Sequence, residues 1–316
     1  MKALIFNPEL TIGDVPEPEP GPSQALVQVQ AVALNFGELA YRPEGLGPDH
    51  VSGWDAAGIV VRAAADGTGP LEGTRVATFG WSGAWAERRV VDVGDLAVVP
   101  DHVDLGAAAA LPVAGTTALQ AVRRLGPIRG RRVLVTGASG GVGRFAVQLA
   151  ARAGAHVIAS VGSPERGAGL AAAGAAEIVL GPERLRDRVY GVLDNVGGSQ
   201  LAEAFLRLED DGVVQAIGKA SREPTVIDFE LARVRSARGR IENFNISVPL
   251  GDDLDHLVSL LAAGKLDPQI GWRGPWDRAT EAARALLNRR VAGKAVIDLP
   301  SSNSSNAGGE DGPVGS

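Results

Sequence analysis

The sequence predicts an α/β protein in which a doubly wound parallel sheet is joined to a second domain made mostly of β-strands. Three observations support this prediction: short apolar stretches separated by turn residues over residues 1–100, alternating strand-like and helix-like segments from residue 131 onward, and a glycine-rich turn where that alternation begins. The length of 316 residues favours about two domains.

The first hundred residues have the pattern of a β-domain. Apolar stretches alternate there with Gly, Pro and Asp turns, as in ALVQVQAVAL (25–34), AAGIVVRAA (56–64) and RVATFG (75–80). Several short strands separated in this way are typical of a twisted or barrel-like sheet.

The middle of the chain alternates between strands and helices. Continuously apolar segments predict buried strands at 131–137, 156–162, 177–180, 189–197 and 212–218. Between them, residues 143–154 and 163–174 predict helices, the second with Pro164 in its first turn and Gly174 after its end. Repeated units of this kind predict a parallel sheet with helices on both faces.

The pattern changes again near residue 247. Two amphipathic helices are predicted at 253–264 and 276–290, and a last strand at 294–300. The tail, residues 301–316, has almost no apolar content and is expected to be disordered.

Composition excludes several classes of function. The net charge of −6 without basic clusters argues against a dedicated nucleic-acid binder. The chain has no cysteine, which removes disulfides, thiolate nucleophiles and sulfur-ligated zinc. No apolar run approaches membrane-spanning length and the N-terminus does not match a signal peptide, so we expect a cytoplasmic protein without membrane contact.

The glycine-rich turn LVTGASGGVGRF (134–145) predicts a nucleotide site, because it follows a predicted strand and opens a predicted helix. Gly137 allows a tight exit from the strand, Gly140 and Gly141 let backbone N–H groups approach a pyrophosphate, and Gly143 lets the helix pack close to the sheet. The turn residues expected to contact the cofactor are Ser139, Gly140, Gly141, Val142 and Gly143. A glycine-rich turn that binds nothing is the alternative.

The glycines of this turn match two different sequence motifs. As T-G-x-x-x-G-x-G it would suggest a short-chain dehydrogenase, but about 130 residues precede it, whereas that family has its turn near the N-terminus. That family also needs a tyrosine four residues before a lysine, and Tyr41 and Tyr190 are followed there by Gly45 and Asp194. We therefore adopt the second motif, G-x-x-G-x-x-G.

With this motif the chain resembles the medium-chain dehydrogenase/reductase superfamily, and most closely its zinc-free, quinone-oxidoreductase-like branch. The resemblance covers nearly all of residues 1–300. The similar segments, in order, are VALNFGELAYR (32–42), GWDAAGIV (53–60), AALPVAGTTAL (109–119), the segment around the glycine turn (133–159), VLDNVGG (192–198) and GKAVIDL (293–299). The resemblance implies a GroES-like β-barrel domain formed by residues 1–111 and 247–300, and a Rossmann domain formed by residues 112–246.

The resemblance also implies where a catalytic zinc ion would be bound in zinc-dependent relatives. Zinc-dependent relatives have a histidine after the glycine at Gly53, where this chain has Trp54 and then Asp55. His50 is the histidine nearest the expected cleft, and three protein ligands are needed for catalytic zinc. We expect no metal, an Asp55 that braces the fold, and substrates that accept hydride without a Lewis acid, such as quinones or conjugated enones.

The expected cofactor is NADPH. NAD-specific sites place an acid at the end of the second strand, and here SVGSPER (160–166) follows it instead. Ser163 and Arg166 are expected to hold the 2′-phosphate. In the alternative, Glu165 binds the ribose and Arg166 is a solvated helix residue.

The remaining site residues are implied by the resemblance. Asn35 and Thr117 would lie near the nicotinamide, and the cofactor would be bordered by Asn195, Ile217, Gly218 and Phe244. Tyr41 is the candidate proton donor, with packing or a lid contact as the alternative, and Arg42 is a candidate for orienting a carbonyl or a phosphate. Asn35, Tyr41 and Arg42 are thus the expected catalytic residues.

Three functions remain open: an NADPH-dependent reductase of quinones or α,β-unsaturated carbonyls, an enoyl-thioester reductase acting on acyl-CoA or a carrier-bound polyketide, and an NADPH-binding sensor without turnover. A carrier partner would require a basic patch, for which the candidates are Arg123, Arg124, Arg129, Arg131 and Arg132; the alternative is a solvated helix end. We expect a homodimer, with residues 212–218 and 224–231 supplying the edge of the sheet.

Overall fold

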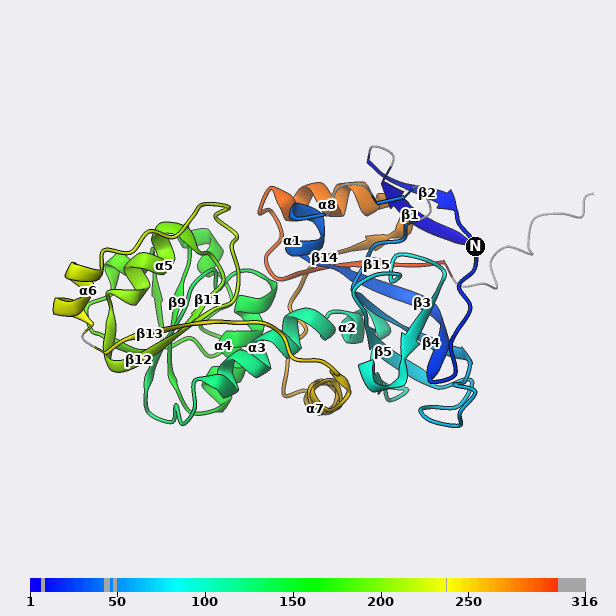
Figure 1. The fold of residues 1–316 in the computed structure, drawn as a ribbon, viewed down its shortest axis with the longest axis horizontal. Coiled ribbons are helices and arrows are strands. Elements are labelled where there is room, and N and C mark those ends of the chain that lie inside the picture. Colours follow the sequence, from blue (N-terminus) through cyan, green and yellow to red (C-terminus); the bar gives the residue numbers. More distant parts are fainter. Residues whose placement is uncertain (7–8, 43–45, 48–49, 237, 301–316) are drawn as a thin grey trace, which may run out of the picture.

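The computed structural model describes residues 1–6, 9–42, 46–47, 50–236 and 238–300. Two lobes lie side by side along the long axis, one around a parallel sheet and one around a mixed sheet (Figure 1). The expectation of a disordered tail at residues 301–316 falls outside the described residues.

The parallel sheet has six strands in the order β10-β9-β8-β11-β12-β13. Its strands are β8 (Arg132–Val135), β9 (His156–Ser160), β10 (Glu177–Val179), β11 (Val189–Asp194), β12 (Leu208–Ala216) and β13 (Arg240–Asn243). Numbered along the chain, this is the order 3-2-1-4-5-6 of a dinucleotide-binding fold, in which the connections change direction between the first and fourth strands. The carboxyl ends of β8 and β11 therefore mark the place where such folds bind their ligand.

Helices cover both faces of this sheet (Figure 1). They are α3 (Pro112–Arg124), α4 (Gly141–Arg152), α5 (Gly198–Phe205) and the short α6 (Phe229–Arg235). The apolar strand segments explain the arrangement, because strands buried on both faces need cover on both.

Two expectations about this lobe are wrong. Residues 163–174 do not form a helix: a 3-10 turn, η2 (Pro164–Gly167), is followed by further turns, and Gly169 and Gly174 have φ values of 77° and 110°. Glycine loses more conformational freedom in a helix than any other residue, which outweighs the helical pattern of the alanines. Residues 212–218 and 224–231 do not supply an edge: the edge strands of the sheet are β10 and β13, residues 224–228 are irregular, and residues 229–231 begin α6.

The mixed sheet has the order β14-β15-β3-β4-β5-β7, with β6 also paired to β3. Its strands are β3 (Gln24–Leu34), β4 (Asp55–Arg62), β5 (Arg75–Phe79), β6 (Arg88–Asp92), β7 (Leu96–Val98), β14 (Ile270–Pro275) and β15 (Lys294–Asp298). A separate hairpin contains β1 (Lys2–Phe6) and β2 (Leu10–Asp14). β15 pairs with β3, so a strand from the end of the described chain completes the sheet of the first hundred residues.

Short helices join the lobes and cover the mixed sheet: α1 (Phe36–Ala40), α2 (Leu105–Ala109), α7 (Gly251–Ala262) and α8 (Ala279–Leu287), with the 3-10 turns η1 (Val93–Asp95) and η4 (Trp276–Arg278). A further 3-10 turn, η3 (Pro182–Arg184), lies between β10 and β11 of the parallel sheet. α7 packs against α3 and β7, and α8 packs against β14 and β15. One buried apolar cluster runs from Phe79 in the mixed sheet through Leu111 to Val135 in the parallel sheet. The two lobes therefore share a core. No described helix is long and apolar enough to cross a membrane.

Candidate cofactor and substrate site

The glycine-rich turn lies at the carboxyl end of β8 and leads into α4. Gly137 has φ 58°, and a Cβ at Gly143 would lie 2.3 Å from the Gly137 carbonyl oxygen, so a side chain there would collide with the backbone of the turn. α4 begins at Gly141 and is 12 residues long. Its first N–H groups have no partner within the helix and favour a negative charge, so this cradle fits the phosphates of a dinucleotide.

A hydrogen-bond network ties the carboxyl ends of β8 and β11 together. The Thr136 hydroxyl donates to Asp194 Oδ1 at 2.6 Å and accepts from the Asn195 N–H at 3.0 Å. Asn195 Nδ2 donates to the Thr136 carbonyl at 2.9 Å, and Asp194 Oδ2 accepts from the Gly197 N–H at 2.8 Å. Burial raises the pKa of Asp194, with the Thr136 hydrogen bond opposing the shift.

Asn195 keeps one polar atom free in this network. Its Oδ1 is buried and has no hydrogen-bond partner among the described residues. A buried acceptor without a donor is costly unless a ligand supplies one. A Cβ built at Gly137 would be 3.4 Å from Asn195 Cβ, which places this free acceptor beside the glycine-rich turn. The site therefore fits a cofactor that carries hydrogen-bond donors, as a nicotinamide carboxamide does.

The next predicted residues follow β12 and β13. The N–H groups of Ile217 and Gly218 both donate to the Asp194 carbonyl, at 2.8 and 3.0 Å, which brings this turn against Asn195. Phe244 is buried, with the Arg124 guanidinium 4.5 Å from its ring centre. Its side chain is thus part of the packing at the carboxyl end of the sheet, and its contact with a cofactor stays a prediction.

Both candidates for binding the adenosine ribose lie just after β9. Ser163 hydrogen-bonds the Glu165 carboxylate, which holds the pKa of that carboxyl below its usual range. The Arg166 guanidinium donates to the backbone carbonyl of Arg289 in the other lobe. A cation and an acid are both available here, so the choice between a 2′-phosphate and a 2′-hydroxyl stays a prediction.

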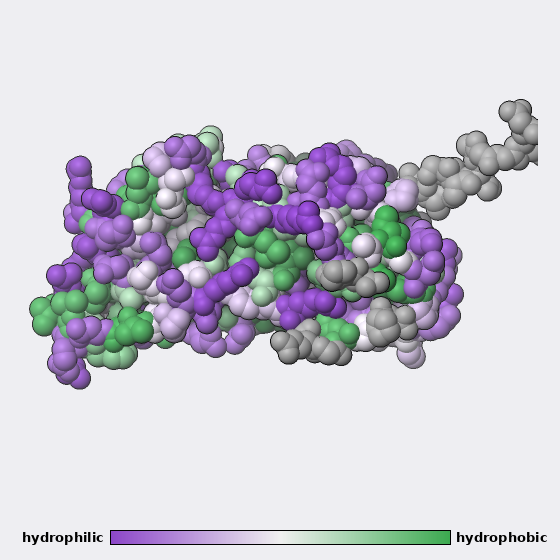
Figure 2. Space-filling model, turned by 90° about the horizontal axis from the view of Figure 1, so that it is seen from above, coloured by the Kyte–Doolittle hydropathy of each residue, from purple (hydrophilic) through white to green (hydrophobic). Residues whose placement is uncertain are grey.

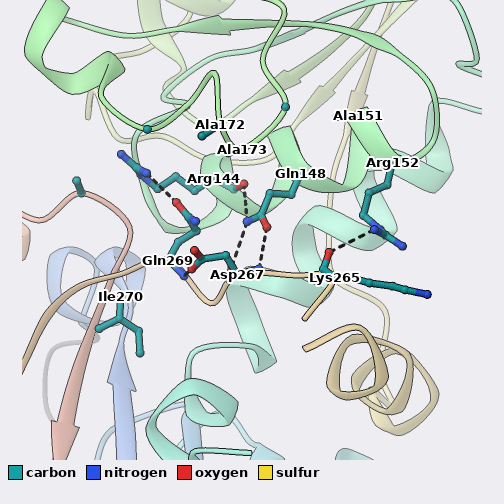
Figure 3. A pocket seen from close by; sticks show the side chains of 13 residues that line it. Arg144, Gln148, Ala151, Arg152, Ala172, Ala173, Lys265, Asp267, Gln269 and Ile270 are labelled. Carbon is teal, nitrogen blue, oxygen red and sulfur yellow. Dashed lines mark hydrogen bonds between the residues drawn. The ribbon is translucent and has the colours of Figure 1, made fainter. Parts of the chain in front are cut away.

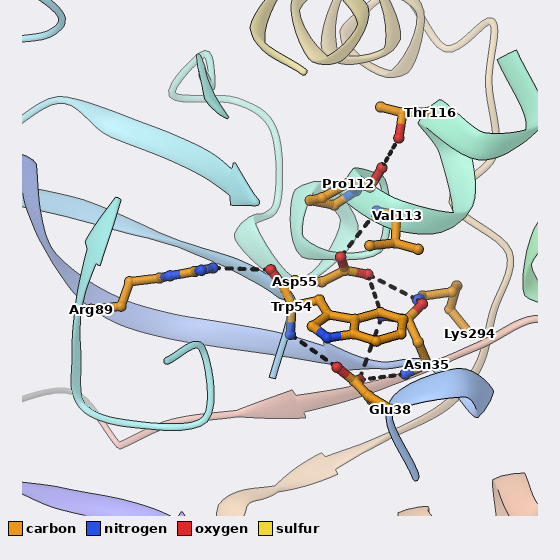
Figure 4. Close-up of polar contacts among 9 residues, drawn as sticks. All are labelled: Asn35, Glu38, Trp54, Asp55, Arg89, Pro112, Val113, Thr116 and Lys294. Carbon is orange, nitrogen blue, oxygen red and sulfur yellow. Dashed lines mark hydrogen bonds and ion pairs between the residues drawn. The ribbon is translucent and has the colours of Figure 1, made fainter. Parts of the chain in front are cut away.

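Asn35 belongs to a buried polar cluster that also contains Glu38, Asp55 and Lys294 (Figure 4). The Lys294 ammonium lies 2.6 Å from Asn35 Oδ1 and 3.1 Å from Asp55 Oδ2, and Asn35 Nδ2 donates to Asp55 Oδ2 at 2.9 Å. Asp55 Oδ1 accepts the Val113 N–H at 3.0 Å, which anchors the start of α3. The bracing role expected for Asp55 is therefore what its contacts show.

Glu38 is the second acid of this buried polar cluster. Its carboxylate accepts the Asn35 N–H at 2.6 Å and the Trp54 N–H at 2.9 Å. Burial, with the charge of Asp55 as the next cause, raises the pKa of Glu38 to about 8. Burial likewise lowers the pKa of the nearby Arg89 to about 10, and its guanidinium donates to the Trp54 carbonyl at 3.1 Å.

Lys294 connects this cluster to the glycine-rich turn. The preceding residue, Gly293, donates its N–H to the Ser139 carbonyl at 2.9 Å and forms a parallel bridge with Gly140. A Cβ at Gly141 would lie 3.0 Å from Lys294 Cδ. Lys294 is a functional candidate that sequence reasoning missed: the segment GKAVIDL was recognised, but a lysine at the start of a strand is most often a solvated residue.

The predicted catalytic residues Tyr41 and Arg42 lie nearer the surface than Thr117, which is expected near the nicotinamide. Thr117 is buried on α3. Tyr41 is half exposed, and its hydroxyl donates to the Lys219 carbonyl at 2.6 Å, a contact between the lobes. The Arg42 guanidinium stacks 4.2 Å from the ring centre of Phe6, and its Nε has no described partner. The proposed chemical roles of Tyr41 and Arg42 would require both side chains to exchange these contacts.

Trp54 stands where the resemblance places the zinc-binding histidine of zinc-dependent relatives. Trp54 packs edge-to-face on Trp81, with ring centres 5.5 Å apart. In the described part of the chain, no three His, Cys, Asp or Glu side chains come together in a way that could hold a metal ion.

A hollow of about 750 Å³ lies between α4, residues 169–174 and residues 265–270, and no predicted site residue lines it (Figure 3). Its polar walls are already hydrogen-bonded: Arg144 to Gln269 at 2.7 Å and to the Ala168 carbonyl at 2.8 Å, and Gln148 to the backbone of Asp267. Because these side chains are already bonded to the protein, we do not assign the hollow to the reaction.

Four of the five arginines expected as a basic patch contact other parts of the protein. Arg123 pairs with Asp253, Arg131 with Glu209 and Arg132 with Glu177, while Arg124 donates to the Asn245 carbonyl. These contacts neutralise much of the charge and disfavour a carrier-protein site at this end of the molecule.

Comparison with known proteins gives two family matches. A model described as an alcohol dehydrogenase GroES-like domain matches residues 21–101, and one described as a zinc-binding dehydrogenase matches residues 173–297.

Among individual proteins, the chain is 28% identical to a quinone oxidoreductase of Pseudomonas aeruginosa, covering 93% of this chain and 97% of that protein. It is 34% identical to the erythronolide synthase EryA2 of Saccharopolyspora erythraea over 90% of this chain, but it spans 8% of that much longer protein. The solved quinone oxidoreductase from Coxiella burnetii superposes with a TM-score of 0.81 at 26% identity, covering 95% of this chain and 99% of that one.

Proposed function

The chain belongs to the medium-chain dehydrogenase/reductase superfamily, in its quinone oxidoreductase-like branch, and from this premise we propose an NADPH-dependent, zinc-independent enzyme that reduces quinones or α,β-unsaturated carbonyls. The observation that carries the proposal is the glycine-rich turn at the carboxyl ends of β8 and β11, beside the free Asn195 acceptor. When bound there, NADPH would supply the hydride.

The residues of the chain would hold the cofactor at three points. The turn residues 139–143 and the start of α4 would bind the pyrophosphate. Ser163 and Arg166 would hold the 2′-phosphate as hydrogen-bond donors. Asn35, Thr117 and Asn195 would border the nicotinamide, with Lys294 fixing the orientation of the Asn35 amide.

The donor set does not fit zinc. Gly53 is followed by Trp54 and Asp55 instead of a histidine, the chain has no cysteine, and the Asp55 carboxylate is already bonded to Asn35, Val113 and Lys294. We therefore derive no step through a metal. The Tyr41 hydroxyl would instead donate a proton to the reduced substrate.

A second candidate is reduction of an enoyl thioester. The exposed cations Lys219, Arg222 and Arg289 at the turn between the lobes, which have no salt-bridge partner among the described residues, favour it. An NADPH-binding sensor without turnover is the third possibility.

We further propose that the protein forms a homodimer through the β13 edge of the parallel sheet. Val226, Phe229 and Val234 beside this edge are 79%, 64% and 82% exposed, and Ile241 on β13 itself is 37% exposed. Apolar side chains beside an unpaired strand edge are suited to pairing with another strand. The cytoplasmic location expected from the sequence stays a prediction.

The proposed function is tested by following NADPH absorbance with purified protein against benzoquinone and a short trans-2-enoyl thioester, with NADH as the control donor. Faster oxidation of NADPH by the quinone supports the leading proposal, and preference for the thioester supports the second candidate. Binding of NADPH without oxidation by either acceptor would support the sensor.

A further inference from the structure

Three cationic residues belong to one turn between the lobes or contact it. Lys219 and Arg222 are the ends of a turn closed by a hydrogen bond from the Arg222 N–H to the Lys219 carbonyl at 3.0 Å. Arg289, two residues after the end of α8, donates from Nη2 to the Ala220 carbonyl in the same turn at 2.8 Å. We call these three residues the inter-lobe cationic cluster.

This cluster lies next to the residues assigned to the nicotinamide end. The turn is held on one side by Asn195 and Val196, whose carbonyls accept the N–H groups of Ala220 and Ser221. On the other side the Tyr41 hydroxyl donates to the Lys219 carbonyl. Figure 2 shows hydrophilic side chains gathered near the middle of one face of the molecule, around a hydrophobic area.

The charge of the cluster is not neutralised within the described chain. Lys219, Arg222 and Arg289 are all exposed, and none forms a salt bridge with a described carboxylate, although Glu223 is adjacent in sequence. Exposed arginines elsewhere, such as Arg233 and Arg278, pair with Glu230 and Glu281. Two of these cations lie on one turn and the third, Arg289, contacts it from the other lobe; the Arg222 guanidinium stacks 5.5 Å from the ring centre of Phe36 but has no anionic partner among the described residues. In a protein with a net charge of −6, three cations without a carboxylate partner form a distinct site for an anion.

We propose that the inter-lobe cationic cluster binds the phosphate of a phosphorylated pantetheine arm, so that the natural substrate is an enoyl thioester carried on such an arm. The inference rests on the proposed reductase function and selects its substrate class. Arginine and lysine are the side chains that bind phosphate most strongly, and a thioester whose double bond reaches the nicotinamide would extend its arm past this turn.

The test compares two substrates that differ only in the phosphate, S-crotonyl-pantetheine 4′-phosphate and S-crotonyl-pantetheine, with NADPH and the full chain. We expect kcat/KM to be about tenfold higher for the phosphorylated substrate at low salt, and the advantage to shrink as sodium chloride is added. In the double variant Lys219→Gln/Arg222→Gln the advantage should disappear while kcat/KM for S-crotonyl-pantetheine stays unchanged.

The matched control is Arg233→Gln/Arg278→Gln, which removes two exposed arginines elsewhere and should keep the full advantage. Arg289→Gln is not used first because its hydrogen bond positions the turn. Equal rates with both substrates in the wild type, or an advantage that survives in the double variant, would overturn the proposal.

Two further comparisons identify the molecule that carries the pantetheine arm and distinguish failure of this inference from failure of the proposed function. Crotonyl-CoA and a crotonylated carrier protein carry the same phosphorylated pantetheine, and the better substrate of the two identifies the source. If benzoquinone is reduced but no thioester is, this inference is wrong and the proposed function stands. If nothing is reduced, the proposed function fails, and calorimetry of pantetheine 4′-phosphate against pantetheine decides the inference: equal affinity refutes it, and tighter binding of the phosphate supports it.

Discussion

The ammonium of Lys294 lies 2.6 Å from Oδ1 of Asn35, so the first residue of β15 fixes the side chain that follows β3. The two residues are 259 positions apart, and both are buried. Through Gly293 the same strand end is bonded to Ser139 in the glycine-rich turn. One lysine thus links the proposed nicotinamide neighbour Asn35 to the proposed phosphate cradle.

Replacing Lys294 with methionine should destabilise the protein. The change keeps most of the side-chain volume but leaves Asp55 buried without its bonded cation, and removing one partner of a buried pair costs roughly 3 kcal/mol of unfolding free energy. Urea unfolding measures this loss. The matched control is Lys265→Met, an exposed lysine, which should change stability by less than about 0.5 kcal/mol. Equal effects of the two substitutions would show that the buried pair is not needed for stability.

Glu38 should make stability depend on pH. Its pKa is about 8 in the folded protein and 4.5 as a reference, so between these values the folded state binds the proton that the unfolded state has lost. Stability contributed by this group is therefore present at low pH and falls as pH rises, by about 1.4 kcal/mol per pH unit through that window. Unfolding of the wild type and Glu38→Gln should diverge between pH 5 and pH 8. Parallel curves would mean that Glu38 is ionised throughout.

Arg166→Gln should reduce the preference for NADPH. Loss of a guanidinium that binds the 2′-phosphate should lower the ratio of kcat/KM for NADPH to that for NADH by at least about tenfold. The control is Arg152→Gln, which removes an arginine at the C-terminal end of α4 and should leave this kcat/KM ratio unchanged. A wild type that prefers NADH would assign the ribose to Glu165 instead.

Gly143→Ala should damage the glycine-rich turn. The new Cβ would meet the Gly137 carbonyl at 2.3 Å and Ala138 Cα at 2.7 Å, and both are backbone atoms. We expect a loss of about 2 kcal/mol in unfolding free energy and weaker NADPH binding by calorimetry. Gly162→Ala, where a Cβ would meet nothing within 4 Å, tests the same substitution without a clash and should leave stability nearly unchanged.

Tyr41→Phe distinguishes two roles of the Tyr41 hydroxyl: donating a proton to the substrate, or only forming a contact between the lobes. If the hydroxyl protonates the substrate, kcat/KM for an enone should fall by more than about tenfold while quinone reduction changes less, because loss of a positioned acid costs at least this much. We expect this selective loss. A similar fall with both acceptors would limit the hydroxyl to its bond with Lys219.

Local patterns were enough to predict most strands and the place of the turn. The apolar segments at 131–137 and 156–162 correspond to β8 and β9, because strands buried on both faces must be apolar throughout. The edge strand β13 escaped prediction since its residues RIEN are mostly exposed and polar. The helix expected at 163–174 failed because local glycines outweigh the alanine pattern.

The sequence by itself determined the two-lobe α/β architecture and the glycine-rich turn, because strand burial and backbone freedom are set by residues close together in the chain. The tertiary structure alone decided that Lys294 is buried against Asn35 and Asp55, that Tyr41 meets Lys219, and that the unpaired cations lie at the inter-lobe turn. Each of these contacts joins residues that are between 69 and 259 positions apart. Their partners are chosen by the packing of the lobes, which no local pattern of the sequence records.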